Sequence, residues 1–242
     1  MYDRTSIDAV LDAALVCHLA FVDGEQPFAV PTLHARMGDV VYVHGSSASR
    51  ALRLLRAGAP AALTVTLIDG LVLARSAFEH SINYRSVMIL GSMREVDDPD
   101  DKLAALKAFT EKVVPGRWAE ARQPTAQELA ATSILAMPIT EASAKIRSGP
   151  PADADSPDGE LTVWAGVLPI LTSWGSPIAD PELRPGIPLS PTFQQLIPGE
   201  DRARACPPVS LTGRWLPVHR LSSRGPPMPT PPLPAHAPRP PP

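Results

Sequence analysis

The sequence predicts a mainly β protein, an antiparallel β-barrel with peripheral helices. About seven or eight apolar, strand-like runs outnumber the helical patterns along the chain. Most of these runs are joined by short turns rather than by the crossover helices that parallel strands require. The apolar fraction of 44% is sufficient to build a core. Together these observations favour an antiparallel barrel over a doubly wound sheet.

The first half of the chain is expected to contain two helices and five strands. A helix capped by Thr5 or Ser6 is predicted to about residue 15, and a second helix over residues 46–57. The strands are predicted at residues 16–22, 28–36, 40–44, 61–68 and 71–76. The Met37-Gly38-Asp39 turn joins the second and third strands. Asp69-Gly70 is a strong hairpin signal between the last two.

The second half repeats the mixture of strands and helices, with longer polar gaps. The predicted strands cover residues 84–96, 134–146 and 161–168, and the predicted helices cover residues 99–114 and 125–132. Gly91 indicates a bulge or a close backbone approach inside the first of these strands. Between residues 148 and 160 the sequence is a polar loop with several prolines and acids.

Proline divides the chain into a folding part and a tail. Of the 242 residues 30 are proline, and more than half of the residues from Gly225 to Pro242 are proline. Such a run forms neither a helix nor a sheet ladder. Residues 1–196 are therefore expected to fold as one domain. Residues 197–242 are expected to be a disordered or polyproline-II-like tail, and the abrupt loss of periodicity would also suit an altered reading frame.

Charge and targeting signals indicate a soluble cytoplasmic protein. The formal net charge is −3, whereas a nucleic-acid or anionic-membrane binder would carry a basic excess. The N-terminus has an acid where a signal peptide needs basic residues, and no apolar run is long enough to span a membrane. Of the two cysteines, Cys17 is expected to be a buried thiol, and Cys206 lies in the tail.

One candidate anion site lies where a strand gives way to a helix. Gly45 permits a sharp turn, and Ser47, Ser49 and Arg50 follow it at the predicted helix start. Unpaired N–H groups, hydroxyls and a guanidinium together suit a phosphate. An ordinary serine cap with a solvated Arg50 is the alternative.

A second polar cluster, residues 78–86, precedes a long apolar strand. Arg85 enters that strand, and a partly buried arginine requires an anionic partner. The partner is either a ligand or one of two nearby acids, Glu79 and Asp97.

The histidines give no metal-site pattern. His18, His34, His44 and His80 fall in the first third of the chain, but without HxH or HExxH spacing. His34 and His44 are near-diagonal neighbours in the predicted hairpin, so they could pair. A core or hydrogen-bonded histidine is the favoured interpretation for each. Lys145 and Arg147 share one face of a strand, which is usually a solvated edge.

Taken together, several segments resemble the pyridoxamine 5'-phosphate oxidase-like superfamily of FMN-binding split barrels. The similarity is greatest to the flavin-nucleotide-binding subgroup that includes the 5-nitroimidazole resistance proteins, and it covers about residues 5–196. The segments that carry it occur in family order: His18-Leu-Ala-Phe, Val30-Pro-Thr, Gly38-Asp-Val-Val-Tyr-Val-His-Gly-Ser, Asp69-Gly-Leu-Val, His80-Ser-Ile-Asn-Tyr-Arg-Ser-Val, Lys145-Ile-Arg-Ser-Gly-Pro and Trp164-Ala-Gly-Val-Leu-Pro.

The resemblance implies an FMN site at the interface of a homodimer. It implies phosphate contacts from Ser47, Ser49, Arg50, Arg85 and Ser86. The flavin ring edge would lie along the strand that holds Pro31 and Thr32. Further contacts implied by the resemblance are ribityl or dimer contacts from Asn83 and Tyr84, a flavin contact from the partner's copy of Trp164, and a substrate pocket faced by His34 and His44.

The implied activity is a flavin-dependent oxidoreductase. It would pass electrons from a reduced nicotinamide to a small acceptor such as a nitroaromatic or a quinone, with His34 or His44 as the acid if one is needed. The C-terminal arginine/histidine motif of true pyridoxamine phosphate oxidases has no equivalent, because His219-Arg220 does not match it. A flavin or haem carrier without turnover, and a deazaflavin-dependent reductase, are the alternatives.

Overall fold

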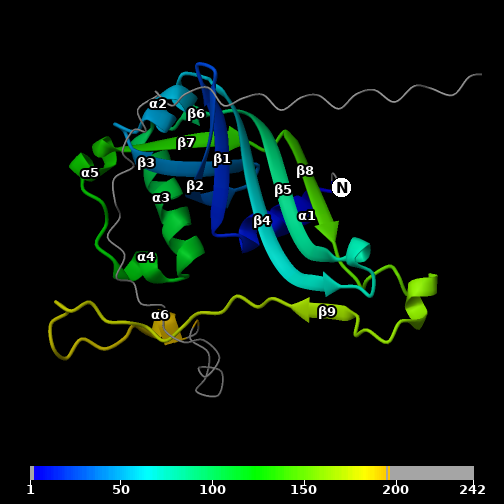
Figure 1. Cartoon of the computed structure of the whole chain (residues 1–242). Coiled ribbons are helices and arrows are strands. Elements are labelled where there is room, and N and C mark those ends of the chain that lie inside the picture. Colours follow the sequence, from blue (N-terminus) through cyan, green and yellow to red (C-terminus); the bar gives the residue numbers. More distant parts are fainter. Residues whose placement is uncertain (1–2, 195, 197–242) are drawn as a thin grey trace, which may run out of the picture. The chain divides into compact units, whose positions relative to one another are not determined.

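The computed structural model describes residues 3–194 and 196 (Figure 1). The predicted tail, residues 197–242, lies outside these residues, and with it Cys206 and His219-Arg220. The described part is built on a nine-stranded sheet in the order β6-β7-β3-β2-β1-β4-β5-β8, with β9 paired to β4. All the strand pairings among the described residues are antiparallel. The sheet curls into a half-barrel, which confirms the predicted mainly β split-barrel class.

The strands alternate with short helices along the chain. The strands are β1 (Val16–Asp23), β2 (Gln26–Met37), β3 (Val40–Ser46), β4 (Pro60–Leu73), β5 (Ser81–Ser92), β6 (Arg94–Glu95), β7 (Thr132–Pro138), β8 (Glu141–Arg147) and β9 (Gly166–Pro169). The helices are α1 (Arg4–Ala13), α2 (Arg50–Arg56), α3 (Pro99–Val113), α4 (Arg117–Glu120), α5 (Ala126–Ala131) and α6 (Pro191–Gln194), with short 3-10 turns η1 (Ala77–Glu79) and η2 (Pro157–Glu160).

The first helix begins earlier than predicted. Asp3, rather than Thr5 or Ser6, is the N-cap of α1, and its carboxylate accepts a hydrogen bond of 2.9 Å from the backbone N–H of Ser6. A carboxylate at this position satisfies an unpaired N–H and suits the positive end of the helix dipole.

The predicted hairpin at Asp69-Gly70 is wrong. Both predicted strands are one strand, β4, which stays paired with β5 on either side of a bulge between Ile68 and Gly70. Tertiary pairing decides this, because β9 also pairs with β4 from Gly70 to Leu73. A Cβ on Gly70 would lie 3.0 Å from the carbonyl oxygen of Leu168, so the dipeptide serves a bulge and a close approach.

Other strand and helix boundaries in the structure also differ from the predicted ones. The strand predicted at residues 84–96 starts earlier and divides into β5 and β6, and Gly91 near the division has a φ of 156° that favours glycine. The strand predicted at residues 134–146 divides into β7 and β8. Of the strand predicted at residues 161–168, only its last part joins β9, and the helix predicted at residues 46–57 is limited to α2.

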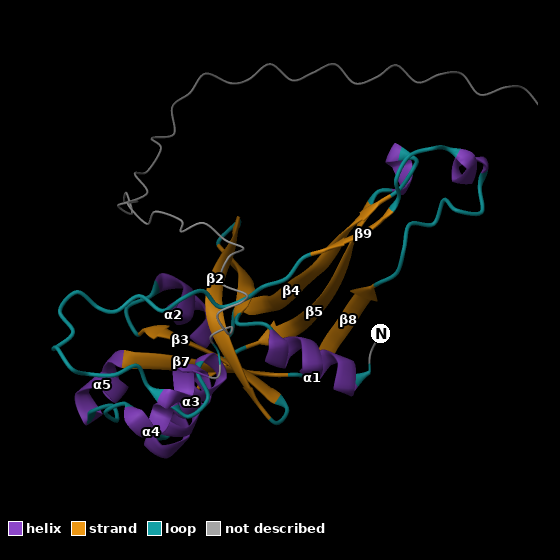
Figure 2. Cartoon of the chain, turned by 90° about the horizontal axis from the view of Figure 1, so that it is seen from below, coloured by secondary structure: helices purple, strands orange, loops and turns teal. Residues whose placement is uncertain are grey.

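One face of the long strands is covered by α1 (Figure 2). From this helix Ile7, Val10 and Leu11 pack into the main core, which also contains inward residues of β4 and β5 such as Leu63 and Ile89. The thiol of Cys17 is fully buried in the same core, as predicted, and burial raises its pKa to about 12. We call this side of the sheet the covered face.

The opposite side of β1, β4, β5 and β8, which we call the open face, has no helix over it in Figure 2, whereas at β2 the Leu33 side chain of this face lies beside α3. Residues paired across antiparallel strands share a face. The pairs His18–Pro31, His18–Thr64, Thr64–Met88 and Met88–Ser143 therefore trace one row of open-face residues across five strands. The exposed large apolar side chains of this face are Val16, Val22, Leu33, Ile68, Leu71, Ile82, Met88, Leu90 and Leu168.

Candidate functional site

The open face carries two cations that no acid neutralises. Lys145 and Arg147 lie on β8 opposite Ser86 and Tyr84 of β5, so all four residues belong to this face, and the guanidinium of Arg147 also donates a hydrogen bond to the buried Asn83. The ammonium of Lys145 lies 5.8 Å from the ring centroid of Tyr84. Among the residues that the structure describes, neither cation has a carboxylate at ion-pair distance. Sequence patterning indicated a solvated edge here, whereas the fold gives a surface for an anion.

Arg85 lies on the other side of the same strand. It is opposite Leu67 and Ile146, and its guanidinium donates two hydrogen bonds, of 2.9 and 2.7 Å, to the carboxylate of Asp69. These bonds raise the pKa of Arg85 and lower that of Asp69. The anionic partner is therefore Asp69, rather than Glu79 or Asp97. Arg85 and Ser86 do not converge within one chain.

Arg50 and the serines lie at the distant end of the sheet. Arg50 is 3.5 Å from the carboxylate of Asp23 and 4.7 Å above the ring of Phe28. Ser49 is the N-cap of α2 without a side-chain capping bond, and the N–H of Ser47 donates to the carbonyl of Ala131.

The strand register separates the two predicted phosphate arginines. Phe28, which Arg50 covers, is aligned through β1 and β4 with Gly91 of β5. Arg85 lies six residues before Gly91 in the sequence, a distance of about 20 Å along a strand. One chain therefore cannot bring Arg50 and Arg85 to the same phosphate.

Pro31 and Thr32 belong to a strand segment with a free edge. Pro31 faces the open side opposite His18, and Thr32 faces the core opposite Cys17. Since β2 pairs with β3 only from His34 to Met37, its second edge before His34 has no strand partner among the described residues. Backbone groups on that edge can hydrogen-bond a flat polar ring.

Asn83 and Trp164 have different surroundings. Asn83 is buried, where its amide N–H donates to the carbonyl of Gly149 and its oxygen accepts a bond from Arg147, so it fixes the loop after β8. Trp164 is 67% exposed, and its ring packs beside Gly166 at the start of β9.

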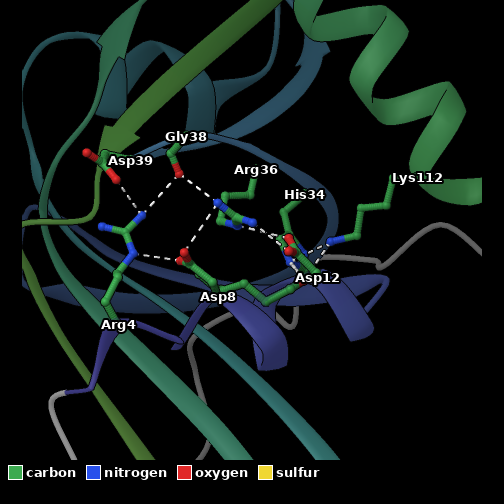
Figure 3. A network of polar contacts seen from close by, with 9 residues as sticks. Arg4, Asp8, Asp12, His34, Arg36, Gly38, Asp39 and Lys112 are labelled. Atoms are coloured by element: carbon green, nitrogen blue, oxygen red, sulfur yellow. Dashed lines mark hydrogen bonds and ion pairs between the residues drawn. The ribbon is translucent and has the colours of Figure 1, made fainter. Parts of the chain in front are cut away.

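His34 is a core residue within a polar network (Figure 3). It is 1% exposed, and its Nε2 lies 2.9 Å from the carbonyl oxygen of Leu11 and 3.0 Å from Nζ of Lys112. Burial, together with the nearby Lys112, lowers the pKa of His34 to about 4. Burial also lowers the pKa of Lys112 to about 8. His34 links α1, β2 and α3 and is closed to a substrate in this conformation.

His44 is directed to the other side of β3. The register places His34 opposite Val43, so His44 lies on the opposite face and the two rings do not pair. The ring centroid of His44 is 4.3 Å from that of Phe109, and burial lowers its pKa. His44 lines a cavity of about 520 Å³ with Leu33, Phe109 and residues of α4. Of the two predicted histidines, His44 is the one that a small molecule can reach.

His80 was not among the predicted site residues. It is exposed, and its Nδ1 lies 2.9 Å from the carbonyl oxygen of Ser76. It lines a cavity of about 560 Å³ together with Leu71, Val72, Leu73, Ser81, Ile82 and Tyr84. The sequence signal was its position directly before a strand, which does not by itself distinguish a ligand from a solvated loop residue.

The described part of the chain contains neither a cluster of metal-ligating side chains nor a membrane-spanning helix. Within residues 3–194 and 196, no three His, Cys, Asp or Glu side chains gather where they could hold a metal ion. None of the helices described there is long and apolar enough to cross a membrane.

A family model and two solved structures match most of the folded part of this chain. The family model described as pyridoxamine 5'-phosphate oxidase matches residues 3–146. The FAD and haem binding protein from Mycobacterium smegmatis is 40% identical, with a TM-score of 0.77 over 81% of this chain and 96% of that one. The flavocytochrome Anf3 from Azotobacter vinelandii is 39% identical, with a TM-score of 0.76 over 81% of this chain and 91% of that one.

A more distant structure shares the fold alone. A proposed 5-nitroimidazole antibiotic resistance protein from Bacteroides thetaiotaomicron is 18% identical, with a TM-score of 0.51 over 60% of this chain and 84% of that one. No curated protein matches the chain. The family match covers more than half of the chain, and the two nearer structures agree with it along most of their lengths. The chain therefore belongs to the pyridoxamine 5'-phosphate oxidase family.

Proposed function

We propose that this protein binds a flavin on its open face and is an oxidoreductase. In this proposal it passes electrons from a reduced nicotinamide to a small acceptor such as a nitroaromatic or a quinone. The observation that carries the proposal is the pair of cations on the open face, Lys145 and Arg147, beside apolar side chains and a free strand edge. The names of the two nearer structures, one FAD-binding and one a flavocytochrome, support it.

The residues present fit a flavin phosphate. Lys145 supplies charge, and so does Arg147, whose guanidinium keeps further N–H groups besides the one that bonds Asn83. The hydroxyl of Ser86, which now donates a long 3.4 Å bond to the carbonyl of Lys145, can turn toward an anion. The free edge at Pro31 and Thr32 offers backbone groups to the ring edge. When bound, the flavin supplies the hydride and single-electron transfer chemistry, and the protein positions it.

A proton-carrying side chain also lies on this face. His18 is exposed opposite both Pro31 and Thr64, on the row that the ring would cover. A histidine there can hold or move a proton beside the ring. His44 has that role instead if the acceptor enters the cavity beside Phe109.

The open face also supports the expected homodimer. Ile68 is 50% exposed and Met88 is 47% exposed, and several more large apolar side chains of this face are exposed with them. Large exposed apolar surface marks an interaction site in soluble proteins. A second copy of the chain would cover these side chains and enclose the flavin between two sheets. Trp164 and the exposed residues after β9 would then reach the partner's site.

Cofactor release tests the phosphate site. The double variant Lys145→Ala/Arg147→Ala should weaken flavin binding by about 100-fold or more, since each removes a charge-assisted contact of about 1.5–3 kcal/mol. Arg50→Ala/Arg85→Ala is the matched control, because both arginines are already ion-paired within the chain. Absorption spectra and mass spectrometry of the released cofactor measure occupancy and distinguish FMN, FAD and a deazaflavin.

The outcomes separate the proposals. A wild-type protein that takes up no flavin would overturn the function itself. If the arginine control loses its flavin while the Lys145/Arg147 variant keeps full occupancy, the phosphate site is the one predicted from the sequence. A bound flavin that NADH and NADPH do not reduce would favour a carrier over an enzyme.

A second candidate function is a protein that holds both flavin and haem. Both nearer structures are named for a haem or a cytochrome as well as for a flavin. Titration of the purified protein with haemin, followed by absorption, tests this function independently of flavin.

A further inference from the structure

The ring nitrogens of the four described histidines differ in what they contact. Nε2 of His34 is occupied by Leu11 and Lys112, and the ring is buried. Nδ1 of His44 is buried without a partner. Only His80, within the part of the chain that the structure describes, has one nitrogen bonded to a backbone carbonyl while the ring remains exposed.

This arrangement prepares the second nitrogen of His80 as a ligand. When Nδ1 donates its hydrogen to the carbonyl of Ser76, the tautomer is fixed and Nε2 keeps its lone pair. Histidines that ligate metals almost always donate their other N–H in this way. Nε2 of His80 has no hydrogen-bond partner among the described residues, and it belongs to a residue that lines a cavity.

The carbonyl that orients His80 is itself held in place. The N–H groups of Arg75 and Ser76 donate to one carboxylate oxygen of Asp153, at 2.5 and 3.0 Å, and Asp153 is buried. Glu79 donates its backbone N–H to the same carbonyl of Ser76. The turn before β5 is therefore rigid, so the imidazole is positioned before any ligand arrives.

The cavity next to His80 suits a large flat apolar ligand. Its volume of about 560 Å³ is in the range of small-molecule and cofactor sites. Leu71 and Ile82 line it on the open face, and Leu168 of β9 lies opposite Leu71 on the same face. These three side chains are between 36% and 54% exposed, so part of their apolar surface is left uncovered by the described residues of one chain.

We propose that His80 would ligate haem iron through Nε2, with the apolar side chains of Leu71, Ile82 and Leu168 offering surface to the porphyrin. The inference rests on the second candidate function, the binding of haem. An iron porphyrin combines the two properties that this site recognises, a metal that prefers an imidazole and an extended apolar disc. Because the site opens to solvent, the propionate carboxylates can stay in water and require no dedicated cation.

Haemin titration of the full chain tests the assignment. The wild type should give a histidine-ligated Soret spectrum, and His80→Ala should weaken binding by at least tenfold and abolish that spectrum. Added imidazole should restore the spectrum in His80→Ala, because it replaces the missing ligand. His80→Met should shift the Soret band and raise the haem potential. Glu79→Gln, in the same turn but without an imidazole, is the matched control and should retain the wild-type spectrum.

Flavin occupancy and circular dichroism report folding of each variant independently of haem. His80 is exposed, and among the described residues its side chain is hydrogen-bonded to the backbone carbonyl of Ser76 rather than to a core side chain, so His80→Ala should keep both signals. If the wild type binds no haem, the haem function fails, and the axial assignment fails with it. If the wild type binds haem and His80→Ala gives the same spectrum and affinity, the haem function stands and the assignment of His80 is overturned.

Discussion

The two faces of β5 have similar side chains but different surroundings. Val87 and Ile89 on the covered face are 1% and 0% exposed, whereas Met88 and Leu90 on the open face are 47% and 39% exposed. An antiparallel sheet with one face in water normally alternates apolar with polar residues. The apolar open face therefore indicates a surface that is covered in the working protein, while the covered face already stabilises the single chain.

The covered face owes its closure to α1 and the contacts that hold it. Arg4 and Arg36 bond the acids of α1 and both donate to the carbonyl of Gly38, in the turn between β2 and β3 (Figure 3). Lys112 of α3 donates to the carbonyl of Leu11 at the end of α1. In the described chain no corresponding helix lies over the open face of β4, β5 and β8, and only its β2 end lies beside α3.

Introducing a carboxylate on each face of β5 should give the largest difference between the two faces. Val87→Glu places an unpaired carboxylate in the core and is expected to cost more than about 4 kcal/mol or to prevent folding. Met88→Glu should leave the single chain folded but dissociate the proposed dimer, because the charge would face the partner's apolar surface. Circular dichroism and sedimentation measure the two effects.

Two outcomes of these charge substitutions would contradict the comparison of the two faces. If Met88→Glu remains a dimer with its flavin bound, the open face is not the interface. If Val87→Glu folds with normal stability, the covered face is not the core.

Truncating one apolar side chain on each face should give a smaller difference, which appears in the free energy of unfolding. Leu11→Ala is expected to lower the free energy of unfolding by about 2–5 kcal/mol, because it leaves a cavity under α1. Leu90→Ala should change it by about 0.5 kcal/mol or less in the dissociated chain. Urea unfolding at several protein concentrations separates the two. An equal loss for both variants at low concentration would contradict the comparison.

The covered face should also respond to acid through His34. Its pKa falls from 6.5 to about 4 on folding, so the unfolded chain binds more protons between these values. This group's contribution to stability is therefore full above about pH 6.5 and is lost as the pH falls toward 4. His34→Gln should flatten that part of the stability curve. An unchanged slope in the variant would show that His34 does not titrate as buried.

The smallest effect on stability is expected at Arg75 and Ser76, where the chain leaves β4. Bonds from the backbone N–H groups of Ser76 and Arg75 lower the pKa of Asp153, so its stabilising contribution is lost as the pH falls below its ordinary value of 3.8. Asp153→Asn should remove that acid sensitivity and loosen the turn before His80 while the sheet stays intact. Hydrogen exchange of Arg75 and Ser76 measures the loosening. Unchanged protection would mean that β9 alone holds this segment.

The parts predicted well from the sequence are those set by local signals. The turn at Gly38 was predicted because the glycine and its flanking strands form a local pattern, and the capping box of Thr125 with Glu128 marks the start of α5 near the predicted helix start. Asp69-Gly70 gave the same local signal and led to a wrong hairpin, since strand pairing with β5 and β9 overrode it. Turn chemistry permits a hairpin, and distant strands decide whether one forms.

The same limit of local signals explains which features of the site residues could be predicted from the sequence. Residue types indicated that Arg85 needs an acid, but not that the acid is Asp69, which the bulge of β4 places beside it. Nothing in the spacing separated Lys145 and Arg147 from an ordinary solvated edge. Their importance follows from the lack of a carboxylate nearby, which is a property of the folded surface.

By itself, the sequence determined the mainly β class, most strand positions and a buried Cys17, because alternation and turn residues act over a few neighbours. It also determined that both faces of β5 are apolar. Only the tertiary structure decided which of those faces α1 covers, which arginines are neutralised and which histidine has an open nitrogen. These properties depend on contacts between residues far apart in the chain, and no local pattern encodes them.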